Sequence, residues 1–218
     1  MNRTALLVGA TGLVGSELLQ LLLADNYFSS VIILSRKTIN IQHQKLKEII
    51  VDFNQLENYA SEINAQYIYC CLGTTIKKAG SQEAFKKVDY EYPLAIAQIA
   101  KKNGAENFSI ITALGADKNS SIFYNRVKGE IQDALIQLDF KQLQIIQPSL
   151  LLGERSEKRF GENIGQKIAP IFNQLLIGGF KKYKAIEGKQ VAKAMLFYSK
   201  QANPKVQILT NDLLLNVK

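Results

Sequence analysis

The first fifteen residues place the strongest constraint on what this chain can fold into. The apolar run Thr4–Val8 favours a short β-strand, and it leads directly into the sequence Gly9-Ala10-Thr11-Gly12-Leu13-Val14-Gly15. After this turn, leucines recur with helical spacing at positions 18, 19, 22 and 23. The order of strand, glycine-rich turn and helix predicts the beginning of an α/β fold.

Each glycine of this turn has a separate physical role. A Cβ at Gly9 would oppose the sharp exit from the strand, Gly12 leaves room for a pyrophosphate, and Gly15 permits close packing of helix on sheet. The amides of the first helical turn and the helix dipole then face the anion, and the Thr11 hydroxyl adds a donor. The turn therefore predicts nucleotide binding, with a purely structural tight turn as the alternative.

Strand and helix patterns alternate through the first 152 residues. Strands are expected at 31–34, 49–51, 67–72, 108–112 and 143–146, and helices at 81–102 and 124–138, with Pro93 bending or splitting the first near Tyr92. This alternation predicts an α/β fold with a doubly wound parallel sheet. Residues 153–218 are expected to be a small C-terminal appendage on the same domain. Helices near 163–176 and 191–200 and a strand at 206–209 would fold over the ligand edge and supply a substrate pocket.

Composition narrows the classes of partner. A chain of 218 residues with 47% hydrophobic and 21% charged residues is typical of one globular domain with or without an appendage. The net charge of +8 favours an anionic partner. Because the lysine pairs are scattered and no segment matches a helix-turn-helix, a zinc finger or an aromatic RNA-binding surface, we expect a solvated basic surface and no nucleic acid, with nucleic-acid or anionic-membrane binding as the alternative. A phosphate-rich cofactor would use part of this charge.

Cysteine usage and hydropathy predict the compartment. Cys70 and Cys71 are adjacent and would point to opposite faces of a strand, so neither a disulfide nor a metal site is expected. The N-terminal apolar run is too short for a signal peptide, and no stretch approaches the roughly 18 apolar residues of a membrane span. A cytoplasmic protein is expected.

The second expected strand ends in Ser35-Arg36-Lys37. Folds that prefer NAD carry an acidic residue about 20 residues beyond the glycine turn, whereas an arginine receives the 2′-phosphate of NADP. Arg36 and Lys37 therefore predict NADP rather than NAD, with solvated charges as the alternative. At the end of the next strand, Asp52 and Phe53 would hold the adenine, unless Asp52 only begins a turn.

Tyr124 and Lys128 are the strongest catalytic candidates because residues at i and i+4 share one helical face. An ammonium beside a phenol stabilises the phenolate and favours proton exchange, and the same ammonium would hold the nicotinamide ribose. Thr112, at the end of the fifth strand, would polarise a substrate carbonyl. Together with a hydride donor these groups suit a carbonyl reduction; an exposed surface pair is the alternative.

The sequence positions of two further segments indicate where they lie in the fold. Gly73-Thr74-Thr75 ends the fourth strand, where ligands of open α/β sheets bind, and its backbone is free to approach the cofactor. The only histidine, His43, lies in a polar stretch and is expected at the surface.

The chain resembles the atypical branch of the short-chain dehydrogenase/reductase superfamily over roughly residues 3–165. The segments that carry the likeness are residues 9–15, 71–75, 88–89, 115–118 and 124–130, and Pro148. Residues 71–80 and 115–130 are similar to the HIV Tat-interacting-protein oxidoreductase group, whose members bind NADPH. Two positions depart from the superfamily pattern: Thr112 stands where serine is usual, and Asp89 lies near the place of a relay asparagine.

The resemblance implies a Rossmann fold and a role for each matching position. The implied contacts are Gly9, Thr11, Gly12, Leu13 and Val14 with the pyrophosphate, Arg36 and Lys37 with the 2′-phosphate, Asp52 with adenine, Leu72 and Gly73 with the adenosine side, Pro148 to Leu150 with the nicotinamide, and Tyr124 and Lys128 in catalysis. We therefore expect an NADP-dependent oxidoreductase acting on a small carbonyl or alcohol, with a homodimer as the expected assembly. The alternative is a regulatory protein that binds NADPH and signals through a partner.

Overall fold

A computed structural model describes residues 2–153, 178–202 and 204–217 of the chain. Seven strands form one parallel sheet in the order β3-β2-β1-β4-β5-β6-β9. Their bounds are β1 (Thr4–Val8), β2 (Ser30–Ser35), β3 (Leu46–Ile50), β4 (Tyr67–Cys70), β5 (Asn107–Ile111), β6 (Gln142–Gln147) and β9 (Val206–Thr210). The strand order reverses direction between β1 and β4, which is the mark of a doubly wound sheet. The predicted Rossmann-like α/β fold is confirmed.

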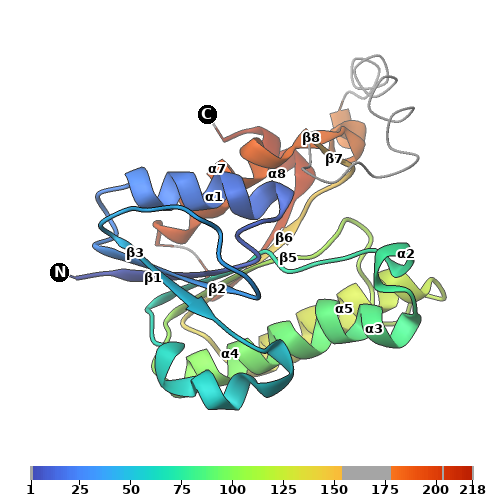
Figure 1. Ribbon diagram of the computed structural model, residues 1–218. Helices are drawn as coiled ribbons and strands as arrows, with labels where there is room; N and C mark the ends of the chain where they lie inside the picture. Colours follow the sequence, from blue (N-terminus) through green and yellow to red (C-terminus); the bar gives the residue numbers. More distant parts are fainter. Residues whose placement is uncertain (1, 154–177, 203, 218) are drawn as a thin grey trace.

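Helices cover both faces of this sheet (Figure 1). One face carries α1 (Leu13–Ala24), α7 (Gly188–Ser199) and α8 (Asn211–Leu215). The other carries the 3-10 helix η1 (Phe53–Glu62), α4 (Tyr92–Lys102) and α5 (Phe123–Gln137), with the short helices α2 (Ile76–Ala79) and α3 (Gln82–Lys86) at one end.

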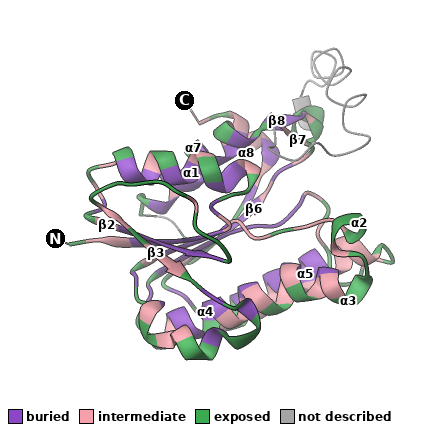
Figure 2. Cartoon of the chain, viewed as in Figure 1, coloured by how far each residue is buried: buried purple, intermediate pink, exposed green. Residues whose placement is uncertain are grey.

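Side chains of the central strands alternate between two cores. In β1, Leu6 and Val8 enter the core beneath α4 and α5, whereas Ala5 and Leu7 enter the core beneath α1 and α7. Figure 2 shows the helices exposing one side and burying the other. Because both faces of the sheet are covered, the inner strands are mostly apolar, which is why the sequence reveals them clearly. The buried polar exceptions, Ser109 of β5 and Gln144 of β6, bind each other: the Ser109 hydroxyl donates to Gln144 Oε1 at 2.7 Å.

The helix expected over residues 81–102 forms with a change of geometry. The Ser81 hydroxyl accepts a hydrogen bond from the Ala84 amide at 3.1 Å and caps α3. A π-helical turn, η2 (Lys87–Glu91), follows, and α4 then begins at Tyr92 with Pro93 in its first turn. Proline is well tolerated at a helix start. The backbone stays helical from Lys86 to Tyr92, so the helix is not split near Tyr92; instead it changes there from π-helical to α-helical geometry.

The described part of the C-terminal extension is built into the sheet. Strand β9 pairs in parallel with β6, and α7 buries Val191, Ala194 and Met195 in the core that α1 also lines. The expectation that the extension folds over the ligand edge is wrong for α7 and β9, because their apolar side chains complete this core. The short segments η3 (Gly178–Tyr183), β7 (Leu151–Leu152) and β8 (Ile186–Glu187) complete the described chain. The helix expected near residues 163–176 lies outside the described residues.

Candidate nucleotide-binding and active site

The glycine turn between β1 and α1 is packed too closely for side chains. Gly9 has φ +87°, and a Cβ there would lie 2.6 Å from the carbonyl oxygen of Cys71. A Cβ at Gly15 would collide with the Gly9 carbonyl oxygen and would lie 2.8 Å from the Gly9 carbonyl carbon. The Gly12 amide donates to the Gly9 carbonyl at 3.0 Å and closes the turn. The sequence-based roles of Gly9 and Gly15 in the turn therefore have a direct steric basis.

The N-terminus of α1 opens at this turn. Gly12 occupies the N-cap position, and no described side chain donates or accepts a capping hydrogen bond there. The first amides of a helix have no partner within the helix, and the dipole makes this end attractive to anions. Thr11 and Gly12 are exposed. The turn, the helix start and the Thr11 hydroxyl thus offer the donors that a phosphate group requires.

The C-terminal extension fixes this helix start. Leu13 packs against the positions of Gly153 and Gly188, and a Cβ at Gly188 would lie 2.8 Å from Leu13 Cγ and 3.0 Å from its carbonyl oxygen. Sequence reasoning missed Gly188, because its partner is 175 positions away along the chain and only the tertiary packing of α7 beside α1 reveals the need for glycine.

The structure around Asp52 and Phe53, the residues expected to hold the adenine, agrees with the prediction only in part. Asp52 Oδ1 accepts hydrogen bonds at 2.9 Å from both the backbone amide and the side-chain amide of Asn54, so Asp52 begins η1. Phe53 is buried, with its ring centroid 5.4 Å from that of Tyr92. The expectation that Phe53 holds the adenine is therefore wrong, because η1 turns its ring into the core.

Tyr92 is a residue that the sequence interpretation missed on this side. Its hydroxyl donates to Asn54 Oδ1 at 2.9 Å. Burial, together with the carboxylates of Asp52 and Glu91, raises the pKa of Tyr92, and Arg36 partly opposes this shift. The electrostatic effects of Arg36 and Asp52 both reach the Tyr92 hydroxyl. The exposed Arg36 and Lys37 follow β2, at the same edge of the sheet as the glycine turn.

A carboxylate does lie near the end of β2, although it comes from β3. Glu48 Oε1 accepts hydrogen bonds from the Ser35 hydroxyl at 3.1 Å and from the Ile39 amide at 2.9 Å. Reading residues in chain order missed Glu48, whereas the parallel register between β2 and β3 brings it close. This oxygen is bound by Ser35 and Ile39, and Glu48 is half-buried, whereas the cations Arg36 and Lys37, directly after β2, are exposed.

The catalytic candidates lie on α5. Lys128 is buried, and its Nζ lies 2.7 Å from Oδ1 of Asp89, with side-chain exposures of 5% and 0%. Tyr124 lies one turn earlier on α5 and packs against Phe85, with ring centroids 5.5 Å apart. Burial alone would lower the pKa of Lys128, but the charge of Asp89, with Tyr124, raises it above its ordinary value. Lys128 is therefore held as an ammonium.

The loop after β4 joins the glycine turn to Lys128. A Cβ at Gly9 would lie 3.0 Å from the Leu72 amide nitrogen, and a Cβ at Gly73 would lie 3.9 Å from Lys128 Nζ. The Thr74 amide donates to Asp89 Oδ2 at 2.9 Å. The half-buried Leu72 and the exposed Gly73 thus lie between the two halves of the candidate site.

The loop after β5 packs directly on α5, next to Lys128. A Cβ at Gly129 would collide with the Lys118 amide and would lie 2.7 Å from Asp117 Cα. The Asp117 amide also donates to the Asn125 carbonyl at 3.0 Å, and Gly115 has φ +81°. The motif segments 115–118 and 124–130 therefore share a structural reason, which is close packing of this loop on the helix that carries Tyr124 and Lys128.

The structure corrects the role expected for Thr112. Its side chain is buried, and its hydroxyl donates to the Ile146 carbonyl at 3.1 Å and accepts from Gln132 Nε2 at 2.8 Å. The expectation that Thr112 polarises a substrate carbonyl is therefore wrong, because its hydroxyl joins β5, β6 and α5 inside the core.

The loop after β6 is held by Asn211. The buried Asn211 accepts from the Ser149 amide at 3.1 Å and donates to the Lys184 carbonyl at 2.7 Å. The Pro148 carbonyl accepts from the Leu114 amide at 3.0 Å, and the Leu150 side chain is 54% exposed. Pro148 is thus buried between the loops after β5 and β6, and Leu150 projects from the last of them.

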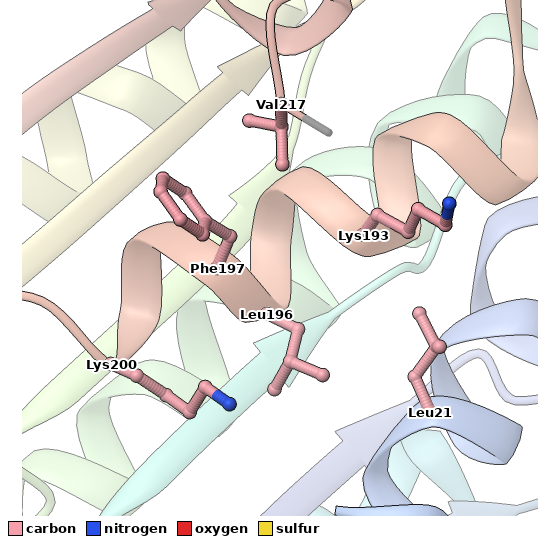
Figure 3. Close-up of a pocket in the computed structure, with 6 residues that line it drawn as sticks. All are labelled: Leu21, Lys193, Leu196, Phe197, Lys200 and Val217. Atoms are coloured by element: carbon pink, nitrogen blue, oxygen red, sulfur yellow. The ribbon is translucent and has the colours of Figure 1, made fainter.

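A separate groove lies between α1 and α7 (Figure 3). It is lined by Leu21, Lys193, Leu196, Phe197, Lys200 and Val217. Leu21 lies near the C-terminal end of α1, about 12 Å along the helix axis from Leu13 at its start. The groove is therefore distinct from the glycine turn. It also lies on the opposite face of the sheet from α5, which carries the catalytic candidates (Figure 1).

Three further observations concern the surface histidine, metal binding and membrane-spanning helices in the described part of the chain. His43 is exposed at the surface, as expected. Among the residues that the structure describes, no cluster of three or more His, Cys, Asp or Glu could hold a metal ion. No helix in the described ranges combines the length and the apolar composition that crossing a membrane requires.

The sequence profile of the NAD dependent epimerase/dehydratase family matches residues 5–117. Protein HTATIP2 of Rattus norvegicus is 36% identical over 170 residues, which cover 76% of this chain and 70% of the rat protein. A mitochondrial protein, FMP52 of Candida glabrata, is 31% identical over 192 residues, which cover 87% of this chain and 82% of the fungal protein. The expected cytoplasmic location is contradicted by these comparisons, since FMP52 of three fungi is named a mitochondrial protein.

Solved structures show the same fold at low sequence identity. MoeE5 in complex with UDP-glucose and NAD has a TM-score of 0.72 at 12% identity, covering 94% of this chain and 75% of that chain. UDP-glucose 4-epimerase of Thermotoga maritima, solved with UDP-glucose, has a TM-score of 0.70 at 15% identity, covering 95% and 76%.

Proposed function

Because this chain belongs to the NAD dependent epimerase/dehydratase family, we propose that it is an NADP-dependent oxidoreductase transferring a hydride between the nicotinamide and a small carbonyl or alcohol. The resemblance to the HIV Tat-interacting-protein oxidoreductase group is confirmed by the rat relative. Family membership supports an NAD(P)-dependent oxidoreductase; the choice of NADP and the hydride-transfer substrate are part of the proposal.

One observation carries this proposal: a single loop contacts both the glycine turn and the buried lysine. Cys71 and Leu72 contact Gly9, and Gly73 lies beside Lys128 Nζ. A dinucleotide bound across this loop would place its pyrophosphate at the N-terminus of α1 and its nicotinamide half near Lys128 and Tyr124. Gly9, Thr11, Gly12, Leu13 and Val14 would bind the pyrophosphate.

The remaining cofactor positions follow along the same edge of the sheet. Asp52, through its second carboxylate oxygen, and Leu72, Gly73 and Thr74 would contact the adenosine side, and Pro148 and Leu150 would flank the nicotinamide. In this proposal residues 1–152 bind the cofactor, and residues 153–218 belong to the same domain. Tyr124 would exchange the proton, and Lys128 would hold the ribose and stabilise the phenolate.

Replacing Tyr124 by phenylalanine tests the enzymatic proposal. We expect NADPH oxidation with a panel of aldehydes, ketones and quinones to fall by about 10²-fold to 10⁴-fold, because the general acid is lost. NADPH affinity should be unchanged, since the ring remains. Tyr198→Phe, the same substitution on α7, is the control and should retain wild-type turnover. If the wild-type rate does not exceed that of Tyr124→Phe with any substrate, the enzymatic proposal fails.

A regulatory NADPH-binding protein is the second candidate, and one observation favours it. The Thr112 hydroxyl is bound inside the core, so the carbonyl-polarising donor expected from the sequence is missing from that position. The turnover assay separates the two candidates: NADPH binding without any Tyr124-dependent turnover would favour the regulatory protein.

Arg36 tests the preference for NADP. We expect NADPH to raise the melting temperature of the wild-type protein more than NADH does, because Arg36 would pair with the 2′-phosphate. Arg36→Ala should weaken NADPH binding by on the order of 30-fold, the loss of one charge-assisted hydrogen bond, and leave NADH binding unchanged. Lys47→Ala, which removes an exposed cation from β3, should change neither. Equal stabilisation of the wild type by both cofactors would contradict the preference.

A further inference from the structure

The Asp89–Lys128 ion pair is the most deeply buried charge pair in the described part of the protein. Nζ and Oδ1 are 2.7 Å apart, and the side chains are 5% and 0% exposed. Burying a charge is unfavourable unless an opposite charge and hydrogen bonds compensate for the lost water. A pair that is kept at such a position therefore calls for a specific reason.

Asp89 connects three elements. It lies in the π-helical turn η2, its Oδ1 faces Lys128 on α5, and its Oδ2 accepts from the Thr74 amide after β4 at 2.9 Å. π-Helical turns are rare and occur frequently at functional sites. Here the π-helical turn η2 lies just before α4 and carries Asp89. The Asp89 carboxylate faces both Lys128 and the loop after β4, which in turn contacts the glycine turn.

We propose that Asp89 is a positioning residue, whose carboxylate keeps Lys128 charged and holds its ammonium beside Gly73, facing the cofactor edge of the sheet. That a cofactor uses the charge of Lys128 rests on the proposed function. That Asp89 maintains this charge does not depend on the proposed function. An asparagine would not replace this aspartate. Its single carbonyl oxygen would serve either Lys128 or the Thr74 amide, and its NH₂ group would face the other donor.

The groups facing Lys128 identify Asp89 as its counter-ion. They are Asp89 from η2, Tyr124 from α5 and Cys70 from β4. Burial favours the neutral amine, and the Asp89 carboxylate opposes this most strongly, so the pKa of Lys128 is raised. Without the carboxylate, burial dominates, and a buried lysine of this kind releases its proton near neutral pH.

Thermal unfolding between pH 6 and pH 9.5 tests this dependence without any ligand. In the wild type the pKa of Lys128 is raised in the folded state, so Lys128 is charged in both the folded and the unfolded protein below the pKa of an unfolded lysine. Its contribution to stability therefore does not change with pH in that range. In Asp89→Asn, the unfolded state binds more protons than the folded state above neutral pH, so stability rises with pH. The difference in melting temperature between Asp89→Asn and wild type should therefore narrow by about 6 °C across this range.

Two variants isolate the charge from packing. Asp89→Glu keeps the carboxylate but overfills the site, so its melting temperature should be lower by an amount that does not change with pH. Glu130→Gln is the matched control, because it breaks the more exposed Lys86–Glu130 pair, 3.1 Å apart, between α3 and the same helix α5. Its difference from wild type should also stay constant. A pH-independent difference for Asp89→Asn would overturn the proposal.

The double variant Asp89→Asn with Lys128→Met covers the case in which Asp89→Asn does not fold. If the double variant folds while the single variant does not, the unpaired ammonium is the cause, as proposed. If neither variant folds, Asp89 is needed only for its structural hydrogen bond with the Thr74 amide, and the proposal is wrong.

NADPH affinity, measured by fluorescence at pH 6 and pH 9, tests the positioning role. Relative to wild type, Asp89→Asn should bind about tenfold more weakly at pH 9 than at pH 6, because Lys128 is then neutral. Asp89→Glu and Glu130→Gln should show no such change. A pH-independent ratio for a folded Asp89→Asn would contradict the positioning role. Absence of NADPH binding by the wild type would refute the proposed function, while thermal unfolding would still decide whether Asp89 keeps Lys128 charged.

Discussion

Replacing Gly15 by alanine is expected to lower the free energy of unfolding by about 3 kcal/mol, at the upper end for overpacking, and to abolish NADPH binding. The added methyl group would collide with the Gly9 carbonyl and lie 3.2 Å from Ala10 Cα, and all these atoms belong to the backbone. The turn has no room to retreat, because Gly9 is itself packed against the Cys71 carbonyl. Relief therefore requires α1 to move away from the turn, which displaces the amides that would bind the pyrophosphate.

Urea unfolding and NADPH titration measure the two effects of Gly15→Ala. The control is Ser16→Ala, in the next position of α1, where the side chain is exposed and its hydroxyl, among the described residues, donates only to the Leu13 carbonyl at 3.4 Å. This variant should bind NADPH as the wild type does. If the free energy of unfolding of Gly15→Ala lies within about 1 kcal/mol of the wild-type value and the variant binds NADPH normally, the backbone of the turn is not as tightly packed as the structure indicates.

Replacing Lys128 by methionine is expected to lower the free energy of unfolding by about 3–5 kcal/mol at pH 7.5, because it leaves the buried Asp89 carboxylate without its partner. Methionine fills most of the lysine volume, so the loss reports charge rather than a cavity. Urea unfolding measures it, and adding Asp89→Asn to Lys128→Met should restore most of the lost stability, since a neutral pair replaces a lone charge.

Lys86→Met is the matched control for this prediction. It breaks the pair with Glu130, whose two side chains are 43% and 30% exposed, and pairs of this kind contribute about 0–1 kcal/mol. A similar loss of stability for Lys86→Met and Lys128→Met would contradict the distinction between a buried and a surface pair.

The sequence predicted the sheet well where physical constraints are local. The apolar runs of β1, β2, β4, β5 and β6 are visible because both faces of each strand are buried, and Pro93 marks the start of α4. The C-terminal extension was harder to predict. Strand β9 lies at the sheet edge with Val206 and Ile208 exposed, so its pattern does not reveal that it pairs with β6.

The candidate site was predictable in part for the same reason. The glycine turn and the i, i+4 relation of Tyr124 and Lys128 are local, and sequence alone places them. Asp89, Glu48 and Gly188 act through partners on other elements, and only the fold brings these residues to Lys128, Ser35 and Leu13. Thr112 shows the converse: its position at the end of β5 suited catalysis, but neighbouring elements bind its hydroxyl.

The most direct test of the central claim, that the turn between β1 and α1 binds the diphosphate of a nicotinamide dinucleotide, is calorimetric titration of the wild-type chain with NADPH. We expect a saturable heat with one site per chain. Titration to millimolar NADPH without heat, together with an unchanged melting temperature, would contradict the claim.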